Sequence, residues 1–123
     1  MIPKIVAALQ GQAPELRVNG DGSAVRDYLH VEDMADAVCL ALSACRPGQW
    51  IPYNVGSGRG ASILELLDTV PEVTGHTVPV SYGPAAPEPP ELVADSSRVR
   101  AELGWASPRS DIATIVADAW NAV

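Results

Sequence analysis

The sequence predicts an α/β (α+β) fold, a small mixed domain that combines about five helices with several short strands. Apolar residues recur at helical spacing in segments near the beginning, in the middle and at the end of the chain. Short runs rich in Val, Ile and Tyr lie between these segments and are typical of strands. Hydrophobic residues make up 47% of the chain and charged residues 19%, as expected of a globular protein with a packed core.

The length of 123 residues allows a single domain, which we expect to span residues 1–123. Its first segment, MIPKIVAALQG, predicts a helix with Pro3 in the first turn and Gly11 as the stop signal. Neither a capping residue nor a strand precedes this helix, so we expect the chain to begin inside a larger fold. No apolar run reaches the roughly 18 residues of a membrane span. No export signal is recognisable, so we expect a cytoplasmic protein that does not contact membranes.

Two short strands are predicted after the first helix, near Leu16–Val18 and Tyr28–Val31, with the turn signal NGDG between them. The segment VEDMADAVCLALSAC then predicts a helix. Its apolar stripe consists of Met34, Val38, Leu42 and Cys45. Alanines and Leu40 widen this stripe, so we expect other parts of the structure to cover it on more than one side.

The middle of the chain predicts a strand followed by a helix. The segment WIPYNVG reads as a short buried strand, and SILELLDTVPEVTG predicts a helix. Ser62 and Glu65 have the spacing of a capping box at the start of that helix. Pro71 lacks an N–H donor and crowds the preceding turn, so we expect a kink or an early end there.

The last third predicts one strand, one loop and two helices. TVPVSY is typical of a strand, and the proline-rich residues 83–91 (GPAAPEPPE) predict an extended surface loop. DSSRVRAELGW predicts a short helix that is capped by Asp95 or Ser96 and ends at Gly104. The final helix, SDIATIVADAWNAV, has one apolar face formed by Ile112, Val116, Ala119, Trp120 and Val123.

A glycine-rich segment, YNVGSGRGAS, raises the question of a cofactor site. Gly56, Gly58 and Ala61 have G-x-G-x-x-A spacing, a relaxed form of the fingerprint that seats a dinucleotide pyrophosphate at a helix N-terminus. That fingerprint needs an acidic residue about 20 residues further on, and this position falls in PVSYGP, which has none. We therefore expect the glycines to serve a tight strand-to-helix turn and Ser62 to cap the helix, without a bound cofactor.

Residues for catalysis or metal binding are absent from the expected positions. No Tyr is followed four residues later by Lys, and Lys4 is the only lysine in the chain. His30 and His76 lack metal-ligand spacing, and His30 suits a structural hydrogen bond at a strand-to-helix junction. Cys39 and Cys45 face different directions on one helix, which favours buried, reduced thiols. The net charge of −7 argues against nucleic-acid binding.

The most specific segment is GDGSAVRDYLHVEDMADAV, residues 20–38. It resembles a signature of the NAD-dependent epimerase/dehydratase family, the extended short-chain dehydrogenases that act on nucleotide-sugars. The resemblance continues through YNVGSG, ADSSRVRAELGW and TIVADAW, so it covers nearly all of the chain. It implies a single substrate-binding-type domain, equivalent to the C-terminal half of the family's fold and lacking the Rossmann half. The NAD fingerprint and the catalytic Tyr and Lys of a complete member would then lie upstream of Met1.

The resemblance also implies two substrate-binding residues. Arg26, from VRDY, matches the arginine that contacts the diphosphate of a UDP-sugar; the alternative is an ion pair with a neighbouring carboxylate. In the loop where the family often has Arg-x-Gly-Asp, this chain has Ala85 to Glu88, so the arginine is missing. Glu88 at best replaces the aspartate that approaches the ribose, and the alternative is a solvated carboxylate. We therefore expect weak UDP-sugar binding by this chain alone.

Three hypotheses for function follow. The first is the UDP-sugar-binding portion of an epimerase, not catalytic by itself, which works with a Rossmann-domain partner docked on an exposed apolar face. We expect that face to involve the first helix and MADAVCLALSAC. The second is a non-catalytic interaction module that buries this face by self-association. The third, which we favour least, is a cofactor-free enzyme that uses carboxylates such as Asp27, Asp33 or Glu88.

Overall fold

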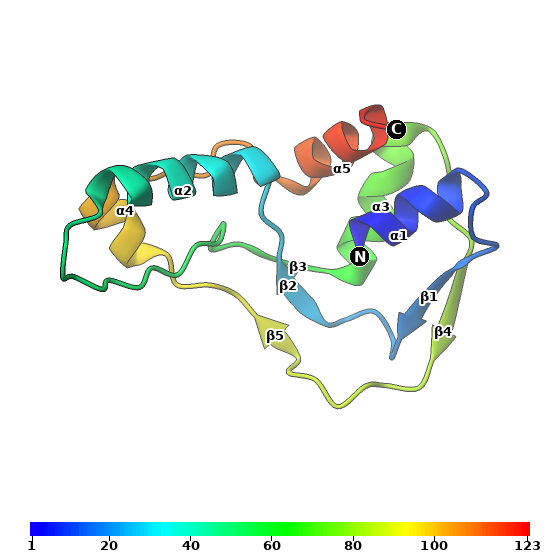
Figure 1. Ribbon diagram of the computed structural model, residues 1–123. Helices are drawn as coiled ribbons and strands as arrows, with labels where there is room; N and C mark the ends of the chain where they lie inside the picture. Colours follow the sequence, from blue (N-terminus) through cyan, green and yellow to red (C-terminus); the bar gives the residue numbers. More distant parts are fainter.

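The computed structural model describes residues 1–123 and contains five helices and five strands, which confirms the predicted mixed α/β class. The elements are, in chain order, α1 (Ile2–Leu9), β1 (Leu16–Asn19), β2 (Val25–Asp27), α2 (Val31–Ala44), β3 (Gly60–Ser62), α3 (Ile63–Thr74), β4 (Val80–Gly83), β5 (Glu91–Leu92), α4 (Ser97–Leu103) and α5 (Ile112–Asn121). The molecule is elongated: α1, α3 and α5 gather with β1 and β4 at one end, and α2 and α4 lie at the other (Figure 1).

The larger hydrophobic core lies at the end that holds α1, α3 and α5. β1 and β4 pair in parallel there, with Leu16 opposite Val80. Helix α5 packs against both α1 and α3, and α1 also contacts β1. The buried side chains of this core are Ile5, Ala8, Leu16, Val18, Ile63, Leu66, Val70, Val78 and Val116. Each large aliphatic side chain contributes about 1.5–3 kcal/mol on burial, so this cluster is the main apolar source of stability.

A smaller core joins α2 to α4 at the other end. Ala37, Val99 and Trp105 are its buried members. The Trp105 indole N–H donates a hydrogen bond of 2.8 Å to the backbone carbonyl of Asp33, so the one polar group of this buried ring has a partner. The guanidinium of Arg100 lies 4.9 Å from the centre of the Trp105 ring and adds a cation–π contact.

A three-stranded sheet lies between the two ends in the order β3-β2-β5. β2 is the central strand, antiparallel to β3 and parallel to β5. Arg26 stands opposite Ala61 on one side and Leu92 on the other. Because both neighbours are hydrogen-bonded to it, β2 is the most constrained strand of this sheet and fixes the backbone of Arg26.

The capping box predicted at the start of α3 is present. The Ser62 hydroxyl accepts from the Glu65 backbone N–H, and the Glu65 carboxylate accepts from the Ser62 N–H. The early end expected at Pro71 is wrong, because α3 continues to Thr74 and closes on Gly75 in the left-handed conformation. Pro71 is exposed, so water can solvate the carbonyl that loses its partner, while the buried apolar face keeps the helix in place.

Two predicted strands are wrong. Residues 28–31 do not form a strand: β2 ends at Asp27 and α2 begins at Val31. The segment WIPYNVG forms no strand either, and Trp50 is 86% exposed. A strand needs a hydrogen-bonded neighbour, and no other segment of this chain runs beside residues 50–56 as a strand. The turn NGDG joins β1 and β2, but these strands belong to different sheets and form no hairpin.

The apolar stripe of α2 is exposed, so the expectation that it is covered within this chain is wrong. Met34, Val38 and Leu42 are 40%, 50% and 67% exposed. The buried residues of this helix are Asp33 and Ala37, on the side that faces the smaller core. Within the chain α2 packs mainly on α4, and this contact leaves the apolar stripe substantially exposed. The helix therefore presents an apolar surface to solvent.

The thiols follow the same pattern. Cys39 and Cys45 are free and exposed, so the expected burial of these two side chains is wrong. Cys39 on α2 and Cys45 at its C-cap both lie outside the contact that α2 makes with α4, which explains their exposure. None of the helices combines the length and the apolar character that crossing a bilayer requires.

Candidate functional site

The structure brings the two predicted site residues together. Arg26 projects from the centre of β2, and its Nη2 lies 2.5 Å from Oε2 of Glu88. Nη1 of Arg26 donates to the backbone carbonyls of Val25, at 2.7 Å, and Pro89, at 3.1 Å. The Arg26 side chain is 25% exposed and that of Glu88 46% exposed. A fixed, partly solvent-accessible guanidinium in this position is suited to binding an anion.

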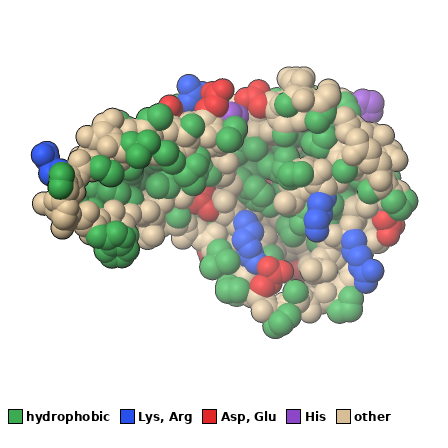
Figure 2. Space-filling model, viewed as in Figure 1, with side chains coloured by type: hydrophobic (Ala, Val, Ile, Leu, Met, Phe, Trp, Pro, Cys, Tyr) green, Lys and Arg blue, Asp and Glu red, His purple; other side chains and the backbone are tan.

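The surroundings of Arg26 carry several charges. Figure 2 shows basic side chains spaced over the face that carries β1 and β2, with acidic side chains next to them. Ala85 lies in the loop between β4 and β5, against Gly20, and contributes no charge. Burial raises the pKa of Tyr28, although the charge of Arg26 opposes this effect, so the Tyr28 phenol is neutral at physiological pH.

The glycine-rich loop is occupied by a carboxylate of the chain itself. Oδ1 of Asp27 accepts from the backbone N–H of Ser57, at 2.9 Å, and from its hydroxyl, at 2.5 Å. Oδ2 accepts from the backbone N–H of Gly58, at 3.0 Å, and of Ala94, at 3.2 Å. A Cβ at Gly56 would stand 2.6 Å from Oδ2 of Asp27, so only glycine permits this approach. The amides that a pyrophosphate would need are therefore already used.

The Asp27 carboxylate is held in its charged form. Burial opposes its ionisation, but the Ser57 hydroxyl and the N–H groups of Gly58, Ala94 and Ser57 outweigh burial and lower the pKa of Asp27. This arrangement, which we name the Asp27 cradle, joins β2 to the glycine loop and to the segment after β5. It fixes the residue next to Arg26, so it positions the arginine.

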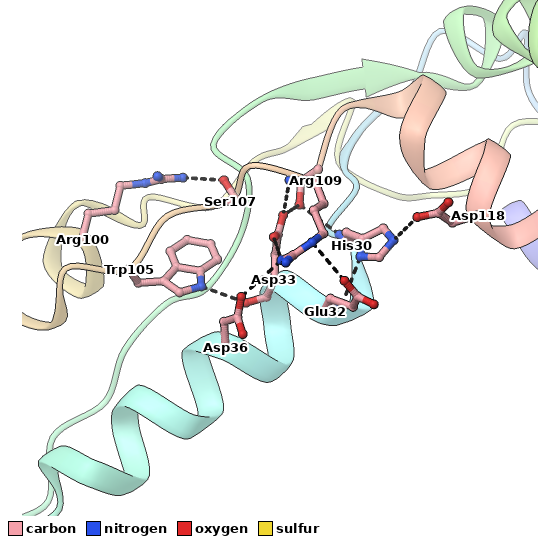
Figure 3. Close-up of polar contacts among 10 residues, drawn as sticks. His30, Glu32, Asp33, Asp36, Arg100, Trp105, Ser107, Arg109 and Asp118 are labelled. Carbon is pink, nitrogen blue, oxygen red and sulfur yellow. Dashed lines mark hydrogen bonds and ion pairs between the residues drawn. The ribbon is translucent and has the colours of Figure 1, made fainter.

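A second polar cluster anchors the N-terminus of α2 (Figure 3). Asp33 is fully buried, and its Oδ2 accepts from the Ser110 hydroxyl at 2.5 Å and from the Arg109 backbone N–H at 3.0 Å. The Arg109 guanidinium also pairs with Glu32, at 2.9 Å, and with Asp36, at 3.3 Å. These contacts tie α2 to the segment before α5, which gives the cluster a structural role.

His30 belongs to the same junction. Its Nδ1 accepts from the backbone N–H of Glu32 at 3.1 Å and caps α2, and its Nε2 lies 3.0 Å from Oδ2 of Asp118 on α5 (Figure 3). As the sequence predicts, His30 makes structural hydrogen bonds. No group of His, Cys, Asp and Glu side chains in the structure is arranged to hold a metal ion.

The three carboxylates considered for cofactor-free catalysis do not converge. Asp27 binds the glycine loop, Asp33 binds Ser110 and Arg109, and Glu88 binds Arg26. None of the three shares a hydrogen bond with another. The geometry therefore offers no acid–base pair among these three carboxylates.

Sequence reasoning missed the roles of Asp27 and Asp33. An acidic residue in the first turn of a helix is favourable in itself, so nothing in the sequence indicates that Asp33 is completely buried. For Asp27 the sequence does contain a signal. A G-S-G loop offers several backbone N–H donors, and if no ligand binds there, an acceptor from elsewhere in the chain has to satisfy them. Asp27 and the loop are about 30 residues apart in the sequence, so the sequence alone does not show that they meet.

Comparison with known proteins gives the chain's family. A model of the NAD dependent epimerase/dehydratase family matches residues 1–56. UDP-glucose 4-epimerase of Corynebacterium glutamicum is 38% identical to the chain and aligns with 98% of it, but with only 39% of its own length. The chain belongs to the NAD-dependent epimerase/dehydratase family. Within the family it corresponds to a C-terminal part of UDP-glucose 4-epimerases.

Solved structures agree with this assignment. UDP-glucose 4-epimerase from Stenotrophomonas maltophila, crystallised with NAD and formylated UDP-arabinopyranose, superposes with a TM-score of 0.89 at 37% identity. The enzyme from Bifidobacterium longum, in complex with NAD+ and UDP, gives a TM-score of 0.89 at 30% identity. In each case the match covers 98% of this chain and 38% of the other. The chain therefore corresponds in fold to less than half of the length of each enzyme.

Replacing Asp27 by Asn tests the cradle, because the amide has the same size but carries no charge and turns N–H groups toward the loop. Hydrogen bonds to a charged group contribute about 1.5–3 kcal/mol, so we expect the free energy of unfolding at neutral pH to fall by about 2–3 kcal/mol. Because folding lowers the pKa of Asp27 from 3.8, its stabilisation is complete above that value and is lost as pH falls through the folded pKa. Urea unfolding at neutral pH and in acid below pH 3.8 measures both effects.

Asp68→Asn is the matched control, since Asp68 is exposed on α3 and its side chain makes no hydrogen bond. We expect this variant to change the unfolding free energy by less than about 0.5 kcal/mol. The difference between the wild-type protein and Asp27→Asn should shrink in acid. A difference that is equal at both pH values contradicts the role of the Asp27 charge.

Proposed function

We propose that the chain forms the nucleotide-sugar-binding portion of a UDP-glucose 4-epimerase-like enzyme and is not catalytic by itself. The observation that carries this proposal is the position of Arg26 at the centre of β2, within the VRDY motif and beside the Asp27 cradle. The presence of UDP compounds in two structurally similar epimerases supports it. In this proposal Arg26 holds the diphosphate of a UDP-sugar.

Arg26 has donors left for such a ligand. A guanidinium has five N–H donors, and Arg26 uses three of them, on Val25, Pro89 and Glu88. The bond to Glu88 is also exchangeable, since both side chains are partly exposed. Planar, permanently charged donors bind phosphate oxygens in pairs, which favours a diphosphate over a neutral ligand.

The chain lacks residues for hydride transfer at the sugar. Solved relatives contain NAD, but in this chain the amides of the glycine loop bind Asp27, so these residues do not fit the pyrophosphate of that cofactor. Neither Tyr28 nor Tyr53 is activated as a base: burial raises the pKa of Tyr28, and a hydrogen bond to Glu102 raises that of Tyr53. Substrate holding is the role that remains.

Binding of a UDP-sugar by this chain alone is weak in this proposal. Ala85 stands where the family often has an arginine, so one charge-assisted contact to phosphate is missing. Such a contact is worth roughly 1.5–3 kcal/mol, which corresponds to about ten- to a hundredfold in affinity. We therefore expect a dissociation constant in the range of about 0.1–1 mM.

Titration calorimetry of the 123-residue chain with UDP tests the proposal. Arg26→Gln should lower the affinity for UDP by roughly ten- to a hundredfold, because it removes a charge-assisted contact. Arg17→Gln is the matched control: Arg17 is exposed on β1, forms no ion pair, and its loss should change the affinity by less than about twofold. Equal affinity of Arg26→Gln and the wild-type protein, or no UDP binding by the wild-type protein, contradicts the proposal.

The exposed stripe of α2 supports a partner for this portion. The chain spans 39% of the Corynebacterium relative, so more than half of that enzyme has no counterpart here. Met34, Val38 and Leu42 form an apolar strip that is 40–67% exposed, which is the surface expected where another part of the enzyme docks. We propose that a Rossmann-type portion covers it. Helix α1, by contrast, buries Ile5 and Val6 in the chain's own core.

Self-association is the alternative, because the same strip can be buried between two copies of the chain. Sedimentation velocity of the chain alone distinguishes the two: a monomer over a wide concentration range supports the Rossmann-type partner, and a stable dimer supports self-association. Both alternatives depend on α2, so a variant of this helix affects either assembly.

Val38→Glu tests the docking surface. The chain is expressed together with the unmatched part of the Corynebacterium glutamicum relative, and complex formation is followed by gel filtration. Val38 is half exposed, so the new charge leaves the fold intact but should weaken the complex by at least tenfold, because a charge is buried in an apolar contact. Ser43→Glu adds the same charge on the polar side of α2 and should have little effect. Equal binding by both variants contradicts the proposed surface.

A further inference from the structure

The proline-rich loop between β4 and β5 is fastened at its two ends. Residues 84–90 include four prolines, which have no N–H donor and cannot form a regular hydrogen-bond ladder. At one end the backbone N–H of Gly20 donates to the carbonyl of Pro84 at 3.2 Å. At the other end the N–H of Val25 donates to the carbonyl of Pro90 at 2.8 Å. The middle of the loop lacks such contacts to the strands.

A single side chain of the sheet, that of Arg26, holds the middle of this loop. Within residues 85–88, the Glu88 N–H bonds Ala86 inside the loop, and the Glu88 carboxylate bonds Arg26 on β2. The adjacent carbonyl of Pro89 also accepts from Arg26, at 3.1 Å. The same guanidinium that is placed for a diphosphate is therefore the one that holds the loop.

The Arg26–Glu88 pair is weak enough to exchange. Both side chains are partly exposed, and ion pairs of this kind change an equilibrium constant by roughly fivefold or less. A diphosphate carries more charge than one carboxylate and offers several acceptor oxygens, so it can displace Glu88. If Glu88 stayed beside Arg26, its negative charge would repel the incoming phosphate at short range.

We propose that Glu88 is an internal competitor for the anion that Arg26 binds, and that it must leave Arg26 when a nucleotide diphosphate arrives. This inference rests on the proposed function. The Arg26–Glu88 contact then acts as a latch on residues 84–90: the loop is held while the site is empty of ligand, and its middle is released when phosphate replaces the carboxylate. Glu88 lowers affinity for anions and leaves affinity for the uncharged nucleoside unchanged.

Glu88→Gln tests the latch, because the amide keeps the size of the side chain and removes the charge. We expect UDP to bind roughly three- to fivefold more tightly to this variant, and uridine to bind the variant and the wild-type protein equally. Hydrogen exchange of the free protein gives a readout without ligand: the backbone amide of residue 88 should exchange faster in the variant than in the wild-type protein, because the latch is removed. In the double variant with Arg26→Gln the gain in UDP affinity should vanish.

Glu91→Gln is the matched control, since it removes the same charge three residues further along without touching Arg26. It should change UDP affinity by less than about twofold. Weaker UDP binding by Glu88→Gln shows that Glu88 is a ligand of the nucleotide and overturns the proposal, as does unchanged loop exchange together with unchanged affinity. Absence of UDP binding in both proteins, with faster loop exchange in Glu88→Gln, contradicts the proposed function and leaves the loop contact itself supported.

Discussion

The carboxylate of Asp27 joins three segments that are far apart in the sequence, and the position of Arg26 depends on it. It accepts hydrogen bonds from Ser57, Gly58 and Ala94, which lie in the glycine loop and after β5. β2 is a short strand of three residues, so this contact at its end adds a further constraint to the ladder bonds on its two sides. The Asp27 carboxylate also accepts the hydrogen bonds of the N–H donors that make the loop resemble a cofactor site. One interaction therefore orients the proposed substrate arginine and makes the loop unfit for a dinucleotide.

The charges around Arg26 account for the weak anion binding that we propose for this chain. The protein has a net charge of −7, so long-range electrostatics disfavours anions and a local arginine must hold them. The chain has Ala85 where a second arginine would help, and Glu88 competes for the first. In the proposed function, a Rossmann-type partner would supply both the cofactor and the closed surroundings in which phosphate contacts are strong. The exposed apolar strip on α2 is consistent with such a partner.

Local signals predicted most helices of the fold, and the missed features depend on contacts across the chain. The capping box of Ser62 and Glu65 and the stop at Gly104 are encoded within a few residues, so they could be predicted. The segment around Trp50 has the composition of a strand but no partner strand within the chain, and local sequence cannot supply one. The exposed stripe of α2 was misjudged for the related reason that amphipathicity shows which side is apolar and not what covers it. Arg26 and Glu88 were identified through family motifs, whereas their mutual contact emerged only from the fold.

The most direct test of the central claim, that this chain holds a nucleotide-sugar at Arg26 and holds no nicotinamide, is residue-resolved NMR of the isotope-labelled protein during titration. UDP-glucose should shift the backbone signals of β2 and of residues 84–90, whereas NAD at the same concentration should shift none. Shifts of Gly56 to Gly58 caused by NAD, or binding of UDP-glucose that leaves β2 and the loop unchanged, would contradict the claim.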